Sequence, residues 1–329
     1  MKPLVLTSSP PPDFTKSGFP DLALYSGNFY FIWGPPPSQD ELAAHLGPHT
    51  PGHDSDGMHW SNWASRWNRS ENRKHRNLSL SDFCQLYETV ELWFDVPAKA
   101  QLELIWLLDY FRDHPKAAAR LKLRLVDRQM AWIGPDGIGD WRPPIVDIAE
   151  RELTTAQAAW QAYRSPTPEA CFDLLQRDMS ALPLLTPVLL DLLAELPSAS
   201  TGLGASEMRM LEMIGRGYSL TNDLFYRRDV RQTRVFNEFE YGYLLDGLAF
   251  GPTPAVTGLD EELRTMRRDN YRDREKAYKR SRLSLTDFGK AVVAHKEDFS
   301  RHNPIDRWWG GTHLTNDNLW RWSPALVKP

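Results

Sequence analysis

Cysteine is scarce in this chain, and long apolar runs are absent. The two cysteines, Cys84 and Cys171, lie far apart and lack the spacing of a metal site. Two cysteines in 329 residues cannot form a disulfide scaffold, so a reducing compartment is expected. No apolar run reaches the length of a membrane-spanning helix, and Leu4–Leu6 is too short for the core of a signal peptide. We therefore expect a cytoplasmic protein without a membrane segment.

An excess of charge of one sign is also missing. Lysine and arginine number 39 against 43 aspartate and glutamate residues, which gives a net charge of −4. A chain so close to neutrality has no overall field that attracts nucleic acid or a membrane surface, so any such attraction must come from a local patch. The length exceeds what one ordinary core holds, and two or three domains are expected.

Complete catalytic motifs are lacking as well. The sequence contains no G-x-S-x-G elbow, no phosphate-binding P-loop and no H-E-x-x-H zinc motif. The glycine-rich stretch Gly134–Gly139 leads into Pro143 and Pro144 rather than into a helix, so it does not match a dinucleotide-binding loop. We expect no cofactor, and a non-catalytic role is favoured over an enzymatic one.

A series of histidines is a candidate for a metal site. His45, His49, His53 and His59 recur at short intervals, with Asp54 and Asp56 between them. Histidines four residues apart can chelate a metal on a helix, but Pro48, Pro51 and Gly52 prevent a helix across the series. We expect no metal.

Two apolar strands around one long apolar helix predict a parallel sheet. Thr89–Phe94 is rich in aromatic and β-branched residues, Lys99–Phe111 is apolar on nearly every side, and Leu121–Val126 returns to a strand pattern. Strand, helix and strand at this spacing form a βαβ unit with parallel strands. Three shorter segments are predicted as further strands: Pro3–Leu6, Leu22–Tyr25 and Phe29–Trp33. The prediction is an α/β domain with a small parallel sheet over residues 1–140.

Asp95 stands directly after the strand Thr89–Phe94. Ligands in α/β folds bind at the carboxyl ends of parallel strands, which makes Asp95 a candidate site residue. The alternative is that Asp95 caps the following helix.

Glycines and prolines around residues 134–144 predict a domain boundary, after which the pattern is helical. An all-α connector is expected over 141–200, with helices at Thr154–Arg164, Thr167–Met179 and Thr186–Leu196. Thr167, followed by Pro168, is predicted as a helix N-cap.

The remaining residues, 201–329, predict a winged-helix-like domain. Its expected elements are helices at Ser206–Arg216, Ser219–Arg227 and Phe236–Phe250, a strand at Pro254–Thr257, and a helix at Ser284–His295 that starts with a capping box at Ser284. A charged insert, Leu259–Arg282, replaces the usual short wing.

The insert carries nine basic residues against three acidic ones between Arg264 and Arg282. Such a stripe attracts phosphate backbones, and Tyr271 and Tyr278 within it can stack on bases. We expect nucleic-acid contacts from six of these residues: Arg267, Arg268, Arg272, Arg274, Lys279 and Arg280. The alternative is a solvated helix with internal ion pairs, for example from Lys276 to Asp273.

The C-terminal tail is unusually aromatic, with four of the 13 tryptophans in the last 25 residues. A frayed tail is normally polar, so we expect this one to be docked. Either it is a clasp that fixes the winged-helix-like domain to its neighbour, or it forms one wall of a binding site, with His313 as its titratable group. The candidate residues for binding a ligand or a partner are Asp306, Arg307, Trp308, Trp309, His313, Trp320 and Trp322.

These C-terminal residues resemble a two-part bacterial family in which domain of unknown function 1835 precedes domain of unknown function 3658. The resemblance covers most of the chain and is most specific at Leu283–Gly289, Ile305–Leu314 and Trp320–Trp322. The N-terminal half matches in outline. The family commonly has a Glu-His-Asp or similar polar set after the strand that ends at Phe94, whereas this chain has Asp95, Val96 and Pro97. The resemblance therefore implies a degenerate N-terminal half and supplies no established activity.

Three functions remain open from the sequence. The first is a non-catalytic binding or regulatory protein, with nucleic acid as the first partner to test. The second is a small-molecule enzyme that uses Asp95 and His313 at the carboxyl edge of the sheet. The third is a scaffold that holds a protein partner or forms an oligomer.

Overall fold

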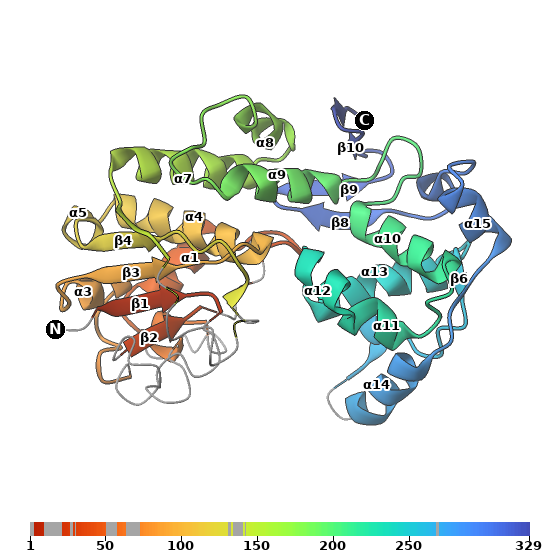
Figure 1. Cartoon of the computed structure of the whole chain (residues 1–329), viewed down its shortest axis with the longest axis horizontal. Helices are drawn as coiled ribbons and strands as arrows, with labels where there is room; N and C mark the ends of the chain where they lie inside the picture. The colour runs from red at the N-terminus through yellow and green to blue at the C-terminus, as the bar shows by residue number, and fades with distance from the viewer. Residues whose placement is uncertain are drawn as a thin grey trace. The chain divides into compact units, whose positions relative to one another are not determined.

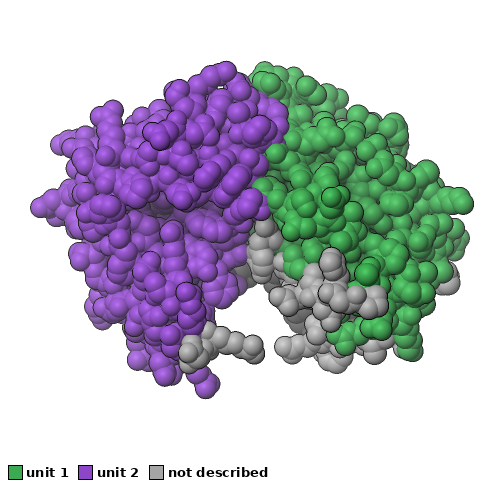
Figure 2. Space-filling view, turned by 180° about the vertical axis from the view of Figure 1, so that it is seen from behind, with its two compact units in different colours: residues 1–31, 36–164, 173–188 green, residues 32–35, 165–172, 189–329 purple. Residues whose placement is uncertain are grey.

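A computed structural model describes residues 3–9, 22–26, 29, 31–50, 58–63, 73–130, 133, 141, 143–267 and 270–329. The chain forms two compact units, which Figure 2 colours separately. Unit 1 comprises residues 1–31, 36–164 and 173–188, and unit 2 comprises residues 32–35, 165–172 and 189–329. The interval 141–200, expected as a helical connector, contributes residues to both units.

Unit 1 is built on a mostly parallel sheet. Its strands are β1 (Leu4–Thr7), β2 (Leu22–Tyr25), β3 (Val90–Trp93), β4 (Leu121–Arg124) and β5 (Ile145–Asp147), in the spatial order β2-β1-β3-β4-β5. The first four strands are parallel, and β5 pairs with β4 in the antiparallel sense. The α/β class and the βαβ unit predicted from the sequence are confirmed, while β5 was not predicted.

Helices surround this sheet within unit 1. They are α1 (Gln39–Leu46), α3 (Leu80–Cys84), α4 (Ala98–Arg112), α5 (Pro115–Ala118) and α7 (Glu150–Tyr163), with a short 3-10 turn at Trp60–Asn62. Helix α4 lies between the sheet and α7, which packs along it (Figure 1). This position explains why α4 is apolar on almost all sides.

The prediction of a strand at Phe29–Trp33 was wrong. Among the described residues of this segment none is in a strand, and the aromatic rings pack into a core instead. The Phe29 ring lies 4.5 Å from the ring of Trp106, and the Phe31 ring lies 5.0 Å from that of Trp160. The Phe31 carbonyl accepts a hydrogen bond from the Tyr163 hydroxyl at 2.9 Å. In a strand, the backbone amide of a neighbouring strand would donate this hydrogen bond.

Two helices have residues in both units: α8 (Glu169–Leu174) and α9 (Leu185–Ala194). Both are shorter than predicted. None of the described helices has the length and the apolar character needed to cross a membrane.

Unit 2 contains helices and several two-stranded sheets. Its helices are α10 (Ala205–Gly215), α11 (Thr221–Tyr226), α12 (Arg228–Thr233), α13 (Glu238–Phe250), α14 (Tyr271–Arg280) and α15 (Asp287–Val293), with 3-10 turns at Leu263–Thr265 and Phe299–Arg301. Its strands pair as β6 (Val256–Thr257) with β7 (Ser284–Leu285), β8 (Asp306–Trp309) with β9 (Thr312–Thr315), and β10 (Arg321–Trp322) with β11 (Leu326–Val327).

Two details of unit 2 correct the sequence prediction. Ser284 lies in β7, so it does not begin a helix; Thr286 is the N-cap of α15 and accepts a hydrogen bond from the Gly289 amide at 2.9 Å. A strand at this point lets β7 pair with β6, which a longer helix would prevent. The charged insert contains α14. The sequence analysis did not predict α12, because its six residues are too few to show helical periodicity.

Gly289 gives the first testable prediction. A Cβ atom at Gly289 would overlap the backbone carbonyl of Ala255, whereas one at Gly247 in α13 would meet only the end of the Arg264 side chain at 3.8 Å. We expect Gly289→Ala to lower the free energy of unfolding by at least about 2 kcal/mol. Gly247→Ala should raise it by about 0.5–1 kcal/mol, because alanine favours a helix. Urea unfolding of both variants measures the difference, and equal stabilities would contradict this packing of α15 against the backbone at Ala255.

Candidate functional site

The order of the strands in unit 1 creates a topological switch point between β1 and β3. The neighbours β1 and β3 are not consecutive in the chain, and connections leave their carboxyl ends in opposite directions along the sheet. In α/β folds of this kind, ligands bind outside the carboxyl ends of the strands at that point. Ser8 follows β1 directly, Ser26 follows β2, and Asp95 comes two residues after β3.

Asp95 is buried at this edge and only partly bonded. Its side chain is 1% exposed, and its Oδ2 atom accepts a hydrogen bond from the Met130 amide at 2.8 Å. Among the residues that the structure describes, its Oδ1 atom has no hydrogen-bond partner. Burial raises the pKa of Asp95 to about 6. The alternative that Asp95 caps α4 is wrong, because the N-cap residue is Pro97 and no side chain caps that helix.

Glu103 is a second buried carboxylate at the same edge, and sequence reasoning missed it. It is fully buried in α4; its Oε2 accepts a hydrogen bond from the Ser26 hydroxyl at 2.6 Å, and its Oε1 lies 3.1 Å from the Lys99 ammonium. Burial raises the pKa of Glu103 to about 7, and the charge of Asp95 adds to that rise. Ser8 is also buried, and its hydroxyl has no partner in the described part of the chain. The signal for Glu103 was an acid with apolar residues on both sides of it, Leu102 and Leu104.

The histidine series does not assemble a metal site among the residues that the structure describes. The imidazole of His59 is 2.9 Å from the Gly47 carbonyl on one side and 2.9 Å from the Ser61 hydroxyl on the other. Both ring nitrogens are therefore occupied. His53, Asp54 and Asp56 lie outside the described residues.

The tryptophan tail is docked within unit 2 and contacts Leu192, which lies in the interval 141–200 predicted as the neighbouring connector. The Trp309 indole donates a hydrogen bond to the Leu192 carbonyl at 2.6 Å, and Trp320 is 5% exposed. The Arg307 guanidinium lies 2.9 Å from the Glu207 carboxylate, a buried ion pair that joins β8 to α10. Arg321 makes a similar pair with Asp298 at 2.9 Å. These side chains are occupied by internal contacts.

The rest of the tail faces solvent to a greater degree. His313 is 2.7 Å from Asp306, and both side chains are exposed. The Trp308 ring stacks on His313 with a centroid distance of 4.6 Å, and the half-buried Trp322 packs edge-on against Phe172. The carboxylate bonded to His313 is therefore Asp306, and Asp95 belongs to unit 1 while His313 belongs to unit 2.

The basic insert divides into paired and exposed cations. Arg274 lies 2.7 Å from Glu261, and Lys279 lies 2.7 Å from Glu275, in keeping with the ion-paired helix alternative. Arg267, Arg272 and Arg280 are exposed. Arg268 lies outside the described residues.

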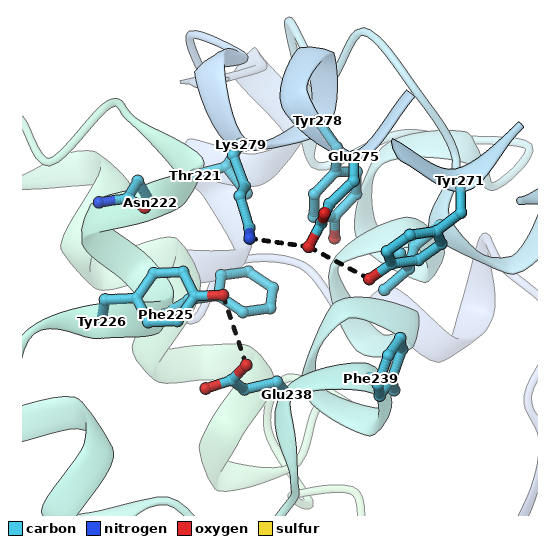
Figure 3. Close-up of a pocket in the computed structure, with 11 residues that line it drawn as sticks. Thr221, Asn222, Phe225, Tyr226, Glu238, Phe239, Tyr271, Glu275, Tyr278 and Lys279 are labelled. Atoms are coloured by element: carbon cyan, nitrogen blue, oxygen red, sulfur yellow. Dashed lines mark hydrogen bonds and ion pairs between the residues drawn. The ribbon is translucent and has the colours of Figure 1, made fainter. Parts of the chain in front are cut away.

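Beside α14 lies an aromatic pocket that the sequence did not reveal (Figure 3). We call it the aromatic pocket; its space of about 400 Å³ is partly open to solvent, and it is lined by Thr221, Asn222, Phe225, Tyr226, Glu238, Phe239, Leu263, Tyr271, Glu275, Tyr278 and Lys279. Phe239 is 51% exposed, and its ring lies 6.2 Å from that of Tyr271. The Thr221 hydroxyl is buried and has no partner within the ranges that the structure describes. No sequence signal joins these residues, because they come from α11, α13, α14 and the 3-10 turn at Leu263–Thr265.

No family model matches this chain and no curated protein matches it, so the resemblance to domains of unknown function 1835 and 3658 stays a prediction.

Asp95 predicts a dependence of stability on pH. Because its pKa is higher in the folded chain than the ordinary value of 3.8, the folded state holds the proton more tightly. The stabilisation is full below about pH 4 and is lost as the pH rises through about 6, a change of about 3 kcal/mol. Asp95→Asn keeps the acceptor for the Met130 amide but cannot titrate. Urea unfolding at several pH values should therefore give a flatter curve for Asp95→Asn than for the wild type, and parallel curves between about pH 4 and pH 7 would contradict the burial of this carboxyl group.

The two ion pairs of the tail should differ in their contribution to stability. Arg307→Ala leaves Glu207 buried without its partner, and we expect a loss of about 3–5 kcal/mol in the free energy of unfolding. His313→Ala removes an exposed pair and should cost less than about 1 kcal/mol. Chemical unfolding of the two variants tests this order. If His313→Ala were the more destabilising change, the clasp interpretation would fail.

Proposed function

We propose that unit 2 binds single-stranded nucleic acid and does so without catalysis. The observation that carries the proposal is the exposed Phe239 ring beside Tyr271 at the mouth of the aromatic pocket. Bases stack on such rings whatever their sequence, and every base has a face that can do so. Because α14 supplies both Tyr271 and exposed arginines, the same helix offers groups for bases and for phosphates.

Exposed cations lie on α14, which lines this pocket, and on α12, which contacts the pocket helix α11. On α14, Arg272 and Arg280 are exposed; on α12, Arg228 and Arg231 are exposed. Helix α11 contacts both of these helices and supplies part of the pocket wall. A flexible single strand that places a base in the pocket has phosphates on either side of that base, so the exposed cations of α12 and α14 favour its binding.

The carboxylates of the pocket already have partners. Glu275 is bonded to Lys279 at 2.7 Å and accepts a hydrogen bond from Tyr271 at 3.2 Å. Glu238 accepts a hydrogen bond from the Tyr226 hydroxyl at 3.4 Å and lies 3.7 Å from Arg234. Their negative charge is therefore largely compensated and repels a nearby phosphate less than two free carboxylates would.

A winged-helix arrangement of unit 2 remains part of the proposal. It is supported by the helices α10, α11 and α13, by the pairing of β6 with β7, and by the bridge between Leu220 and Arg282, which adds a short strand between the first two helices. The third helix of such a domain normally enters the major groove of DNA. Here α13 carries Glu238, Glu240 and Asp246 and contains no lysine or arginine. This charge argues against duplex reading and favours single strands bound at α14.

Fluorescence anisotropy with a labelled 20-nucleotide oligo(U) or oligo(dT) tests the proposal. We expect binding that weakens linearly on a plot of log affinity against log salt concentration. Replacing both Arg272 and Arg280 by Gln should reduce that slope by about 1.4 if each contacts a phosphate, which is about 0.7 for each cation. Phe239→Ala should weaken binding by roughly 5- to 100-fold through lost stacking, with little change in the slope.

A matched control changes two exposed lysines elsewhere in unit 2. Lys290→Gln with Lys296→Gln removes the same charge from α15 and the residues just after it, and should leave the affinity nearly unchanged. Absence of salt-dependent binding by the wild type at micromolar protein would overturn the proposal. Equal losses in the α14 and lysine double variants would show that only overall charge matters and would also overturn it.

A further inference from the structure

The aromatic pocket of unit 2 holds carboxylates as well as rings. Glu238 and Glu275 both belong to its wall, together with Lys279. A single-stranded base that stacks on an aromatic ring is also hydrogen-bonded along its Watson–Crick edge by the groups around it. The acceptors and donors of the pocket therefore decide which base it binds most tightly.

Glu238 is the carboxylate with room for a ligand. Its side chain is 42% exposed. The Tyr226 hydroxyl donates to it at 3.4 Å, and the Arg234 guanidinium lies 3.7 Å from it. Both distances are longer than those of ordinary hydrogen bonds, which measure about 2.5–3.2 Å. A carboxylate has about four acceptor positions, so Glu238 can accept further and shorter hydrogen bonds from a base.

Glu275 is bonded more closely. It lies 2.7 Å from the Lys279 ammonium, accepts a hydrogen bond from the Tyr271 hydroxyl at 3.2 Å, and has a side chain that is 29% exposed. All three residues belong to α14, so these bonds form within one helix. We expect Glu275 to position Lys279 rather than to contact a base.

Lys279 places a donor beside the same tyrosine that Glu238 contacts. Its ammonium lies 5.5 Å from the centre of the Tyr226 ring. An ammonium has three N–H donors, so it can bond Glu275 and a carbonyl oxygen of a base at the same time. Figure 3 shows the ammonium and the Glu238 carboxylate on either side of the Tyr226 hydroxyl. The pocket thus offers a donor and an acceptor around one tyrosine.

The four bases differ in the edge that they present to such a pair. Guanine has two adjacent donors, N1–H and the N2 amine, beside the carbonyl oxygen O6. A carboxylate can accept from two adjacent donors at once, as it does from the guanidinium of arginine. Uracil has a single donor between two carbonyl oxygens, whereas adenine and cytosine each present one amine beside an acceptor nitrogen.

We propose that the aromatic pocket prefers guanine. Its N1–H and N2 amine donate to Glu238, its O6 accepts from Lys279, and its ring stacks on Phe239. The inference rests on the proposed binding of single strands by unit 2, and it adds a base preference to that function.

Fluorescence anisotropy with labelled 20-nucleotide RNAs of repeating UUUG, UUUA or UUUC tests the proposal, with oligo(U) as the reference. The UUUG repeat should bind at least about fivefold more tightly than oligo(U). Hypoxanthine in place of guanine keeps N1–H and O6 but lacks the N2 amine. This replacement should remove most of the gain, because one of the two bonds to Glu238 is lost.

Glu238→Gln tests the residue itself. Glutamine has one acceptor oxygen and a donating amine, so it cannot accept from N1–H and the N2 amine together. The ratio of the affinities for guanine and hypoxanthine RNA should fall to about one, while the affinity for oligo(U) is kept or rises because a negative charge is removed. Circular dichroism checks that the variant is folded.

Glu212→Gln is the matched control. Glu212 lies in α10, is 40% exposed, and pairs with Arg216 at 3.3 Å, and it does not belong to the pocket wall. The same substitution there removes the same charge and should keep the guanine preference of the wild type.

The outcomes separate this inference from the function on which it rests. Equal, salt-dependent binding of all the RNAs would overturn the guanine preference and leave single-strand binding intact. Tighter binding of the UUUA or UUUC repeat, or an unchanged guanine preference in Glu238→Gln, would overturn it as well. So would competition by GMP at the same concentration as the UUUG repeat, which would mark a nucleotide site. Failure of every RNA to bind would overturn both proposals.

Discussion

Burial of strands β1 and β3 on both faces of the sheet is the constraint on which the rest of unit 1 depends. Every side chain of these two strands is buried, which is characteristic of the central strands of a parallel sheet. A charged side chain in these strands needs hydrogen-bond or ion-pair partners, because burial removes it from water. Glu91 accepts two hydrogen bonds from the Arg124 guanidinium, at 2.8 and 2.9 Å, and a third from the Trp93 indole at 2.8 Å. Polar atoms without a partner among the described residues occur instead just beyond the strand ends, where Ser8 and Asp95 lie.

Unit 2 uses buried carboxylates to join segments that are distant in sequence. Glu195, near the end of α9, accepts hydrogen bonds from the amide and the hydroxyl of Ser206 in α10, and burial raises its pKa to about 7. Glu207 accepts a hydrogen bond from the Gly204 amide and pairs with Arg307 of β8. The Arg307 guanidinium also donates to the Glu195 carbonyl at 3.3 Å. These bonds form one polar cluster, which joins the residues just after α9, the start of α10 and the hairpin of β8 and β9. The aromatic rings of this hairpin pack around the arrangement that the bonds define.

Sequence patterns predicted elements whose packing is decided locally and missed those decided by distant contacts. The βαβ unit was recovered because its helix is long and strongly apolar. Phe29–Trp33 was misread as a strand because its alternating aromatic residues have high β-propensity, whereas rings brought from α4 and α7 decide its backbone. Asp95 could be named because strand ends are visible in sequence, but Glu103 reaches the same edge only through the packing of α4. Phe239 and Tyr271 lie on different helices, so no spacing along the chain could have joined them.

Binding of nucleic acid places a specific demand on the surface of unit 2. A polymer of phosphates is held on an exposed surface, where binding releases counterions and each cation adds a salt-dependent increment. Raising the ionic strength therefore weakens this proposed interaction. A chain with a net charge of −4 can accommodate it, because the cations of α14 act only over the short range that salt leaves unscreened.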